Sequence, residues 1–244
     1  LCYRFGTQKG FNECRKECNM NPELWKEVEI RRGKISQAVL DWGLKNVRDF
    51  PWRKDRTPYK VLVAEIILRR TTAKAACKIY EAFIKRYPNI HALSNSDVKE
   101  LEGILLAVGY HKRRALILKD VADFIVSQYK GVIPSTKDDL LKIPHVGQYI
   151  AGAILSLGYG IPSAMVDSNV QRVIGRLFSK KLPAKKRSQS INVIAEVVLP
   201  KERHELFNFA MLDLGALICR YNKTLCQKCP LTAVCDTATS IAST

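Results

Sequence analysis

The chain has 244 residues, of which 47% are hydrophobic and 26% charged, a length and composition that allow a sizeable folded core. No apolar run reaches the roughly 18 residues of a transmembrane helix, and the first residues contain no apolar stretch like that of a secretory signal. The 40 Lys and Arg residues outnumber the 23 Asp and Glu residues and give a net charge of +17. This excess favours a polyanionic partner, above all nucleic acid, over a role in solubility alone.

The N-terminal segment, residues 1–21, is predicted to lie apart from the fold because it is polar and basic and has no hydrophobic period. Met20 begins the stretch MNPELWKEV and could be a natural start, in which case the preceding residues are a leader or an addition. The folded part is expected to begin at residue 22.

Helical periodicity follows in residues 61–87 and 97–129, where apolar side chains recur every three to four positions. The positions predicted to form the core are Leu62, Ile66, Ile79, Phe83, Leu101, Leu105, Val108, Leu118, Val121 and Ile125. Glycine and proline breaks fall at Pro88, Gly109, Gly131–Pro134 and Gly158–Pro162. No stretch alternates convincingly with period two, so the predicted fold class is all-α.

Residues 140–155, LLKIPHVGQYIAGAIL, predict a short helix, a Pro-x-x-Gly turn and a second helix. Gly147 lets the backbone approach a ligand closely, and the amides after it open a helix whose positive end suits a phosphate. Taken alone, the segment is explained equally well as an ordinary helical hairpin.

The next element, AMVDSNVQRVIGRLF, places Asp167 between a Gly- and Pro-rich loop and a helical run. Aspartate is a favoured helix N-cap, and a cap alone would explain the residue. Because Asp167 follows the hairpin closely in sequence, it could also face the nucleic acid that the hairpin binds.

Four of the eight cysteines lie together in CRYNKTLCQKCPLTAVC, with spacing C-x6-C-x2-C-x5-C. They are Cys219, Cys226, Cys229 and Cys235. Such clustering indicates a metal site in a reducing compartment rather than a disulfide framework. Four thiolates can bind either zinc or an iron–sulfur cluster.

These three motifs, in this order, resemble the helix-hairpin-helix base-excision DNA glycosylases, the superfamily of endonuclease III and adenine-DNA glycosylase. The resemblance runs from about Val39 to Asp236. It implies two helical lobes with a DNA-binding groove between them and Asp167 on the groove. The early helix near Lys34–Asn46 is expected to pack with the C-terminal lobe.

The resemblance also implies boundaries, a cofactor and a partner. Residues 22–58 and 164–238 would form the iron–sulfur lobe, and residues 59–163 the helix-hairpin-helix lobe. The cysteine spacing matches the family's [4Fe–4S] ligands, with zinc as the alternative. The expected partner is double-stranded DNA with a mismatched or damaged base, and no membrane is expected to bind. The protein is expected to be an intracellular monomer, located in the cytoplasm and nucleoid, or in the nucleus if the organism is a eukaryote.

Within the hairpin, His145, Val146, Gly147 and Gln148 are expected to contact DNA. The family turn usually reads P-G-x-G, and His145 replaces its first glycine, where a positive φ is expected; histidine tolerates that conformation better than a β-branched residue does. His145 could contact phosphate or be only a tolerated turn residue.

Tyr149 stands where bifunctional members of the superfamily carry a lysine that forms a Schiff base with the sugar. A phenol cannot form one, so the resemblance predicts a monofunctional glycosylase. Tyr149 would then pack on the flipped nucleotide or form a hydrogen bond with it.

The stretch FPWRKDRTPYKVLVAEIILRRTTA resembles the first helix of adenine and thymine-mismatch glycosylases. Glu65 matches the general acid of the adenine enzymes, but Arg69 and Arg70 replace their paired glutamines and suit a guanine. Together with Tyr149, these residues resemble the archaeal-type thymine-DNA glycosylases that act on T·G and U·G mispairs. Adenine opposite 8-oxoguanine or guanine is the alternative substrate, and a non-catalytic DNA-binding module is a second alternative.

In the implied mechanism the base is flipped out of the stack, and Asp167 stabilises the positive charge on the sugar and activates water. Glu65 would position water or bind a pyrimidine edge, because thymine has no N7 to protonate; a structural carboxylate is an equal alternative. Tyr110 is expected near the DNA, and the neighbouring Lys112, Arg113 and Arg114 are expected to meet phosphates.

Overall fold

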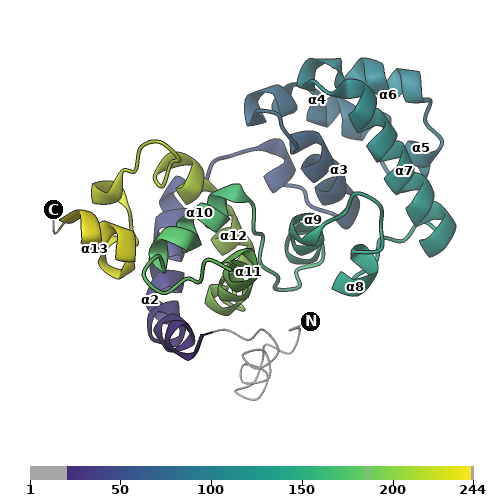
Figure 1. Cartoon of the computed structure of the whole chain (residues 1–244). Helices are drawn as coiled ribbons and strands as arrows, with labels where there is room; N and C mark the ends of the chain where they lie inside the picture. The colour runs from purple at the N-terminus through teal and green to yellow at the C-terminus, as the bar shows by residue number, and fades with distance from the viewer. Residues whose placement is uncertain (1–20, 186, 243–244) are drawn as a thin grey trace. The chain divides into compact units, whose positions relative to one another are not determined.

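The computed structural model describes residues 21–185 and 187–242, so the predicted N-terminal segment and its Met20 lie outside the described residues. Helices account for the secondary structure of this part of the chain, and its β-type pairing is an isolated bridge between Cys219 and Thr224 (Figure 1). The prediction of an all-α fold is confirmed. None of the described helices is both long and apolar enough to cross a membrane.

The chain divides into two compact units, each with its own core. The first unit is formed by the chain up to Arg48 and from Pro162 onward, and the second by Asp49–Ile161. Helices of the first unit are α2 (Pro22–Asn46), α10 (Ser168–Leu177), α11 (Arg187–Val198), α12 (His204–Leu217), η4 (Cys226–Lys228), η5 (Thr232–Val234) and α13 (Asp236–Ala242). Helices of the second are η1 (Pro51–Arg53), α3 (Pro58–Leu68), α4 (Ala73–Arg86), α5 (Ile90–Ser94), α6 (Val98–Leu105), η2 (Leu106–Val108), α7 (His111–Tyr129), α8 (Lys137–Leu140), α9 (Gln148–Ala153) and η3 (Ile154–Gly158).

The unit boundaries differ from those expected. Residues 49–58 belong to the second unit because the ring of Trp52 packs edge-on against Tyr80, with centroids 5.7 Å apart. Ser163 belongs to the first unit because its carbonyl accepts a hydrogen bond from Asn208 Nδ2 at 2.9 Å.

The second unit is built around α3, which is buried on nearly all sides. Thr57 caps the helix by accepting a hydrogen bond from the Lys60 amide at 3.3 Å, and Pro58 occupies its first turn. Helices α4, α7, α9 and the η3 turn pack against it. The ten core positions named above for residues 61–129 are buried, which confirms that prediction.

The first unit joins the two ends of the described chain. Helix α2 packs against α11, α12 and η5, as the resemblance implied for the early helix. Gly43 makes the contact with α12 close, because a Cβ at that position would lie 2.8 Å from the Cβ of Ala210. Arg31 on α2 also forms an ion pair at 2.7 Å with Asp236, the residue directly after the last of the four clustered cysteines.

Candidate functional site

The hairpin of the second unit connects α8 to α9. Its turn closes when the Val146 amide donates a hydrogen bond to the Ile143 carbonyl at 3.1 Å. His145 has φ of 63°, so the predicted left-handed conformation at this position is confirmed. Gly147 has an ordinary extended backbone, and no heavy atom lies within 4 Å of the position a Cβ would take. The position that a side chain would take at Gly147 is therefore open space.

The residues of the hairpin differ in their exposure to solvent, and therefore in whether a ligand can contact them. His145, Gly147 and Gln148 are exposed. Val146 is buried and its amide is already used in the turn, so its side chain belongs to the core of the hairpin. Tyr149 is half-buried on α9.

Two arginines at the end of α3 have different surroundings. The guanidinium of Arg69 donates a hydrogen bond to the carbonyl of His145, so it braces the hairpin. Burial lowers the pKa of Arg69, while the charge of Glu65, one helical turn earlier on α3, acts in the opposite direction. Glu65 itself is buried, whereas Arg70 is exposed with φ of 51°. Of the two arginines, only Arg70 is exposed.

The loop before α7 presents Tyr110, which is 61% exposed. Lys112 and Arg113 are exposed on the first turn of α7, as expected for residues that meet phosphates. The expectation for Arg114 was wrong: its side chain is buried, and its guanidinium donates hydrogen bonds to backbone carbonyls, that of Ile66 among them. A phosphate outside the protein cannot reach it.

In the first unit, Asp167 is the N-cap of α10, and both carboxylate oxygens accept hydrogen bonds. Oδ1 accepts from the Val170 amide at 2.8 Å, and Oδ2 accepts from Asn169 Nδ2 at 2.8 Å. The capping role is therefore real. The two hydrogen bonds also hold the half-buried carboxylate of Asp167 in one orientation.

The segment that leads to Asp167 is fixed by side chains from two other helices. Glu196 on α11 accepts a hydrogen bond from the Ala164 amide at 3.1 Å. Asn208 on α12 accepts one from the Met165 amide at 3.1 Å. The position of Asp167 thus depends on the packing of the whole unit.

A short chain of hydrogen bonds links Asp167 to the cysteine segment. Asn169, which donates to the carboxylate, accepts a bond from Arg172 Nη2 at 2.7 Å. Arg172 in turn donates to the carbonyls of Cys219 at 2.7 Å and Gly215 at 2.8 Å. Sequence reasoning missed Asn169 and Arg172, although their spacing of three residues places both on one side of the first turn of α10.

Gly215 provides the space that this arrangement needs. A Cβ there would lie 2.6 Å from the Cβ of Asn169 and 3.0 Å from its carbonyl oxygen. We expect Gly215→Ala to lower the free energy of unfolding by about 1–3 kcal/mol through overpacking, measured by urea denaturation. Gly33→Ala is the matched control: Gly33 is exposed on α2 with nothing within 4 Å, so alanine should raise the stability by up to about 1 kcal/mol. Equal effects of the two variants would contradict the prediction.

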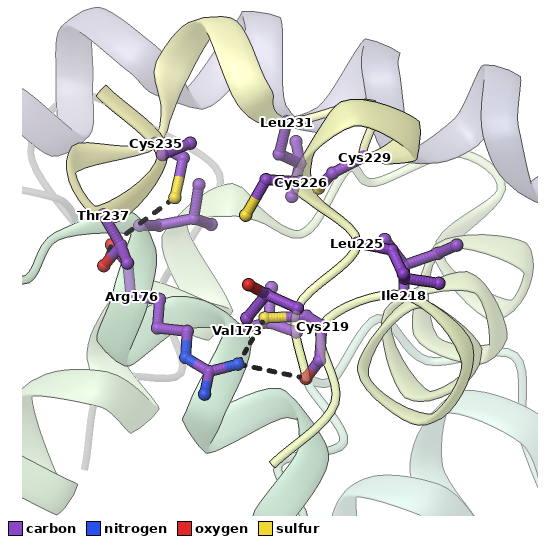
Figure 2. Close-up of a pocket in the computed structure, with 13 residues that line it drawn as sticks. Val173, Arg176, Ile218, Cys219, Leu225, Cys226, Cys229, Leu231, Cys235 and Thr237 are labelled. Carbon is purple, nitrogen blue, oxygen red and sulfur yellow. Dashed lines mark hydrogen bonds between the residues drawn. The ribbon is translucent and has the colours of Figure 1, made fainter. Parts of the chain in front are cut away.

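Figure 2 shows the four cysteines around one pocket of the first unit. The walls between them are largely apolar and are formed by Val173, Leu177, Ile218, Leu225 and Leu231, among others. All four cysteines are free thiols. Burial, together with the neighbouring thiols, raises the pKa of Cys229 to about 11, although a hydrogen bond from the backbone of Leu231 acts in the opposite direction.

Arg176 on α10 braces the first part of this segment. Its Nη1 lies 3.3 Å from the Cys219 sulfur (Figure 2). Nη1 also donates to the Arg220 carbonyl at 2.7 Å, and Nη2 donates to the Tyr221 carbonyl at 3.2 Å. In the described part of the chain, no group of three or more His, Cys, Asp or Glu side chains is placed to hold one metal ion, the four cysteines included.

A helical chain with this hairpin, a capped aspartate and a four-cysteine segment has the features of a base-excision DNA N-glycosylase. Residues 63–196 match the HhH-GPD superfamily of base excision DNA repair proteins, and the chain belongs to this superfamily. It is therefore a DNA glycosylase, as the resemblance predicted.

Among the relatives, a thymine-DNA glycosylase of Aeropyrum pernix is 37% identical over 82% of this chain and 92% of its own length. A thymine/uracil-DNA glycosylase of Methanothermobacter thermautotrophicus is 34% identical over 83% and 91%. An adenine DNA glycosylase of Buchnera aphidicola is 36% identical, but the match covers 58% of that protein. The solved structure of a thermostable thymine-DNA glycosylase superposes with a TM-score of 0.82 and 31% identity, covering 87% of this chain and 98% of that one.

Proposed function

We propose that the protein is a monofunctional mismatch glycosylase. It acts as a monomer on double-stranded DNA, hydrolyses the N-glycosidic bond of thymine or uracil mispaired with guanine, and leaves an abasic site. The observation that carries this proposal is Tyr149, half-buried at the start of α9, where a lyase would need an amine. The thymine and thymine/uracil glycosylases, matched over 92% and 91% of their length, support the choice of base.

Asp167 is the residue best placed to carry the hydrolysis. As the glycosidic bond breaks, the departing base takes the bonding electrons and the deoxyribose becomes positively charged. A carboxylate held by the Val170 amide and Asn169 stabilises that charge without reorganising. It can also accept a proton from the water whose oxygen bonds to the sugar carbon.

Glu65 and Tyr149 belong to the second unit and have supporting roles in the proposal. Their helices, α3 and α9, pack against each other. Tyr149 offers an aromatic face and a hydroxyl to a flipped pyrimidine. Glu65 is buried on α3, so it suits a contact with the pyrimidine edge or with a bound water better than one with solvent.

Exposed groups of the second unit supply the proposed contacts to DNA. The hairpin offers His145, Gly147 and Gln148, and the loops offer Arg70 and Tyr110. Arg70 can form paired hydrogen bonds with O6 and N7 of the guanine opposite the target base. Arg69 supports the hairpin instead of reading a base.

The four cysteines support a [4Fe–4S] cluster as the cofactor. Four cysteine thiolates are the ligand set of such a cluster, and Cys219, Cys226, Cys229 and Cys235 line one pocket. When bound, the cluster supplies a structural cross-link for the segment that Arg172 and Arg176 brace. In the proposal, Asp167 and not the cluster promotes cleavage of the N-glycosidic bond.

Elemental analysis tests the cofactor independently of activity. We expect about four iron atoms per purified chain and the visible absorbance of an iron–sulfur cluster. Cys229→Ser should lose both, whereas Cys77→Ser, outside the pocket, should keep both. One zinc ion per chain and no iron would contradict the cluster.

The substrate is tested with labelled duplexes that carry T·G, U·G, A·8-oxoguanine or A·G, each read with and without alkali. Strand breaks in the T·G and U·G duplexes that appear only after alkali are the expected result. Cleavage confined to the adenine duplexes would assign the chain to the adenine branch. No cleavage of any duplex, with binding retained, would indicate a non-catalytic DNA-binding module.

Borohydride trapping tests the absence of a Schiff base. Because the phenol of Tyr149 cannot form an imine with the sugar, the wild-type protein is expected to give no covalent adduct with mismatched DNA. An endonuclease III enzyme with its own substrate serves as the positive control for trapping. A borohydride-dependent adduct of the wild-type protein would refute the monofunctional assignment.

A further inference from the structure

Arg114 is a buried cation in the second unit, only 4% exposed. Among the described residues its hydrogen-bond partners are backbone carbonyls: those of Ile66 at 3.3 Å and Val108 at 3.2 Å, and those of Arg69 and Gly109. Burial lowers the pKa of its guanidinium. A buried charge is tolerated only when it is hydrogen-bonded. The hydrogen bonds of Arg114 join two separate stretches of backbone, one that ends at Arg69 and one that ends at Gly109.

The carbonyls that Arg114 holds lie directly before two unusual residues. Arg69 precedes Arg70, whose φ is 51°, and Gly109 precedes Tyr110, whose φ is 48°. The left-handed conformation is costly for side chains of this size and persists only where surrounding contacts impose it. One guanidinium therefore fixes the backbone next to both strained residues.

The two strained residues face each other across the loops. The guanidinium of Arg70 lies over the ring of Tyr110, 5.9 Å from its centroid. Arg70 is exposed, Tyr110 is 61% exposed, and Leu106 of the neighbouring η2 turn is 64% exposed. This is an aromatic face and a hydrogen-bonding fork presented together to solvent, the combination that stacks on bases and reads guanine.

We propose that Arg114 is a positioning residue, which holds Arg70 and Tyr110 as one preformed pair for insertion at the mispair. The inference rests on the proposed function for its substrate. Without the clamp, both loops would relax to commoner conformations, and the pair would have to be ordered on every encounter with DNA. Arg114 would thus act on recognition of the mispair while it never touches DNA itself.

Hydrogen exchange of the DNA-free protein tests the clamp without any substrate. Arg114→Lys should speed amide exchange in residues 69–71 and 109–111 and leave the rest of the second unit unchanged. Arg86→Lys is the matched control, because Arg86 forms an exposed ion pair with Glu100 at 2.6 Å; it should change neither loop. Wild-type exchange at both loops in Arg114→Lys would overturn the proposal even if the enzyme proves to be a T·G glycosylase.

A second measurement follows insertion into DNA, with 2-aminopurine placed beside a T·G mispair. Arg114→Lys and Tyr110→Ala should each reduce the fluorescence rise and the single-turnover excision rate by about ten- to a hundredfold, the loss expected for one stacked base. The double variant should lose no more than either single variant. Independent, multiplying losses would show that Arg114 does not act through Tyr110.

Glycine rescue keeps the proposal testable if Arg114→Lys folds poorly. Glycine adopts the left-handed conformation without strain, so adding Arg70→Gly and Tyr110→Gly should restore folding but not the fluorescence rise. Failure of the glycines to restore folding would overturn the clamp. If the wild type excises no base at all, the proposed function fails, and the exchange experiment still decides the role of Arg114.

Discussion

Asp167→Asn is expected to lower the single-turnover excision rate by about 10²- to 10⁴-fold while binding of the mismatched duplex is retained. The change removes the negative charge that we propose faces the sugar. Asparagine is as good an N-cap as aspartate, so the bond from the Val170 amide can persist. The measurement is alkali-dependent strand cleavage under single-turnover conditions, combined with fluorescence anisotropy of the labelled duplex.

Comparison of Asp167→Ala with Asp167→Asn separates the effect of the charge from the effect of the helix cap. Asp167→Ala removes both, so it should show the same loss of rate and an additional loss of about 1 kcal/mol in the free energy of unfolding. If Asp167→Asn weakened DNA binding as strongly as it slowed excision, the residue would be a structural cap and no more. Nearly normal excision by the asparagine variant would exclude the proposed charge stabilisation.

Arg48→Met is expected to destabilise the first unit by about 3 kcal/mol. The carboxylate of Asp213 is completely buried, and it accepts bonds from Arg48 Nε at 2.9 Å and Nη2 at 2.5 Å. Methionine has a similar length but no charge, so the carboxylate would stay buried without its guanidinium. Urea denaturation with a fixed m-value measures the change.

Lys54→Met is the control for this ion pair. Lys54 pairs with Asp49 at 2.7 Å, but both side chains are more than 60% exposed, at 67% and 70%. Solvent screens such a pair, and its loss should have no measurable effect on unfolding. Similar stability changes in the two variants would mean that burial of the pair at Asp213 does not determine its contribution.

The sequence predicted the features that depend on local pattern. Helical periodicity identified the core around α3, α4, α6 and α7, because one face of each helix must be apolar to pack. The motif order indicated the superfamily, and the histidine in the hairpin turn indicated a left-handed residue at position 145. Each of these follows from neighbours within a few residues.

The features that the sequence did not predict join segments far apart in the chain. Arg69 and Arg114 bind backbone carbonyls 76 and 45 residues away, and a carbonyl leaves no signature in a sequence. Arg114 was expected to meet phosphate because it lies close in sequence to Tyr110, which is expected near the DNA. Its spacing from Leu118 and Val121 was a signal that could have corrected this, since it places the arginine on the buried face of α7.

The discontinuous first unit has a consequence for how the enzyme is made. The second unit is one continuous segment, so it can fold on the ribosome as soon as Ile161 has emerged. Helix α2 must wait for partners synthesised much later: Ser36 bonds to a carbonyl 162 residues away, and Arg31 to a carboxylate 205 residues away. The carboxylate of Asp167 takes its final place only after those partners arrive. A nascent chain can therefore display the proposed DNA-reading surface before the proposed catalytic carboxylate is in place.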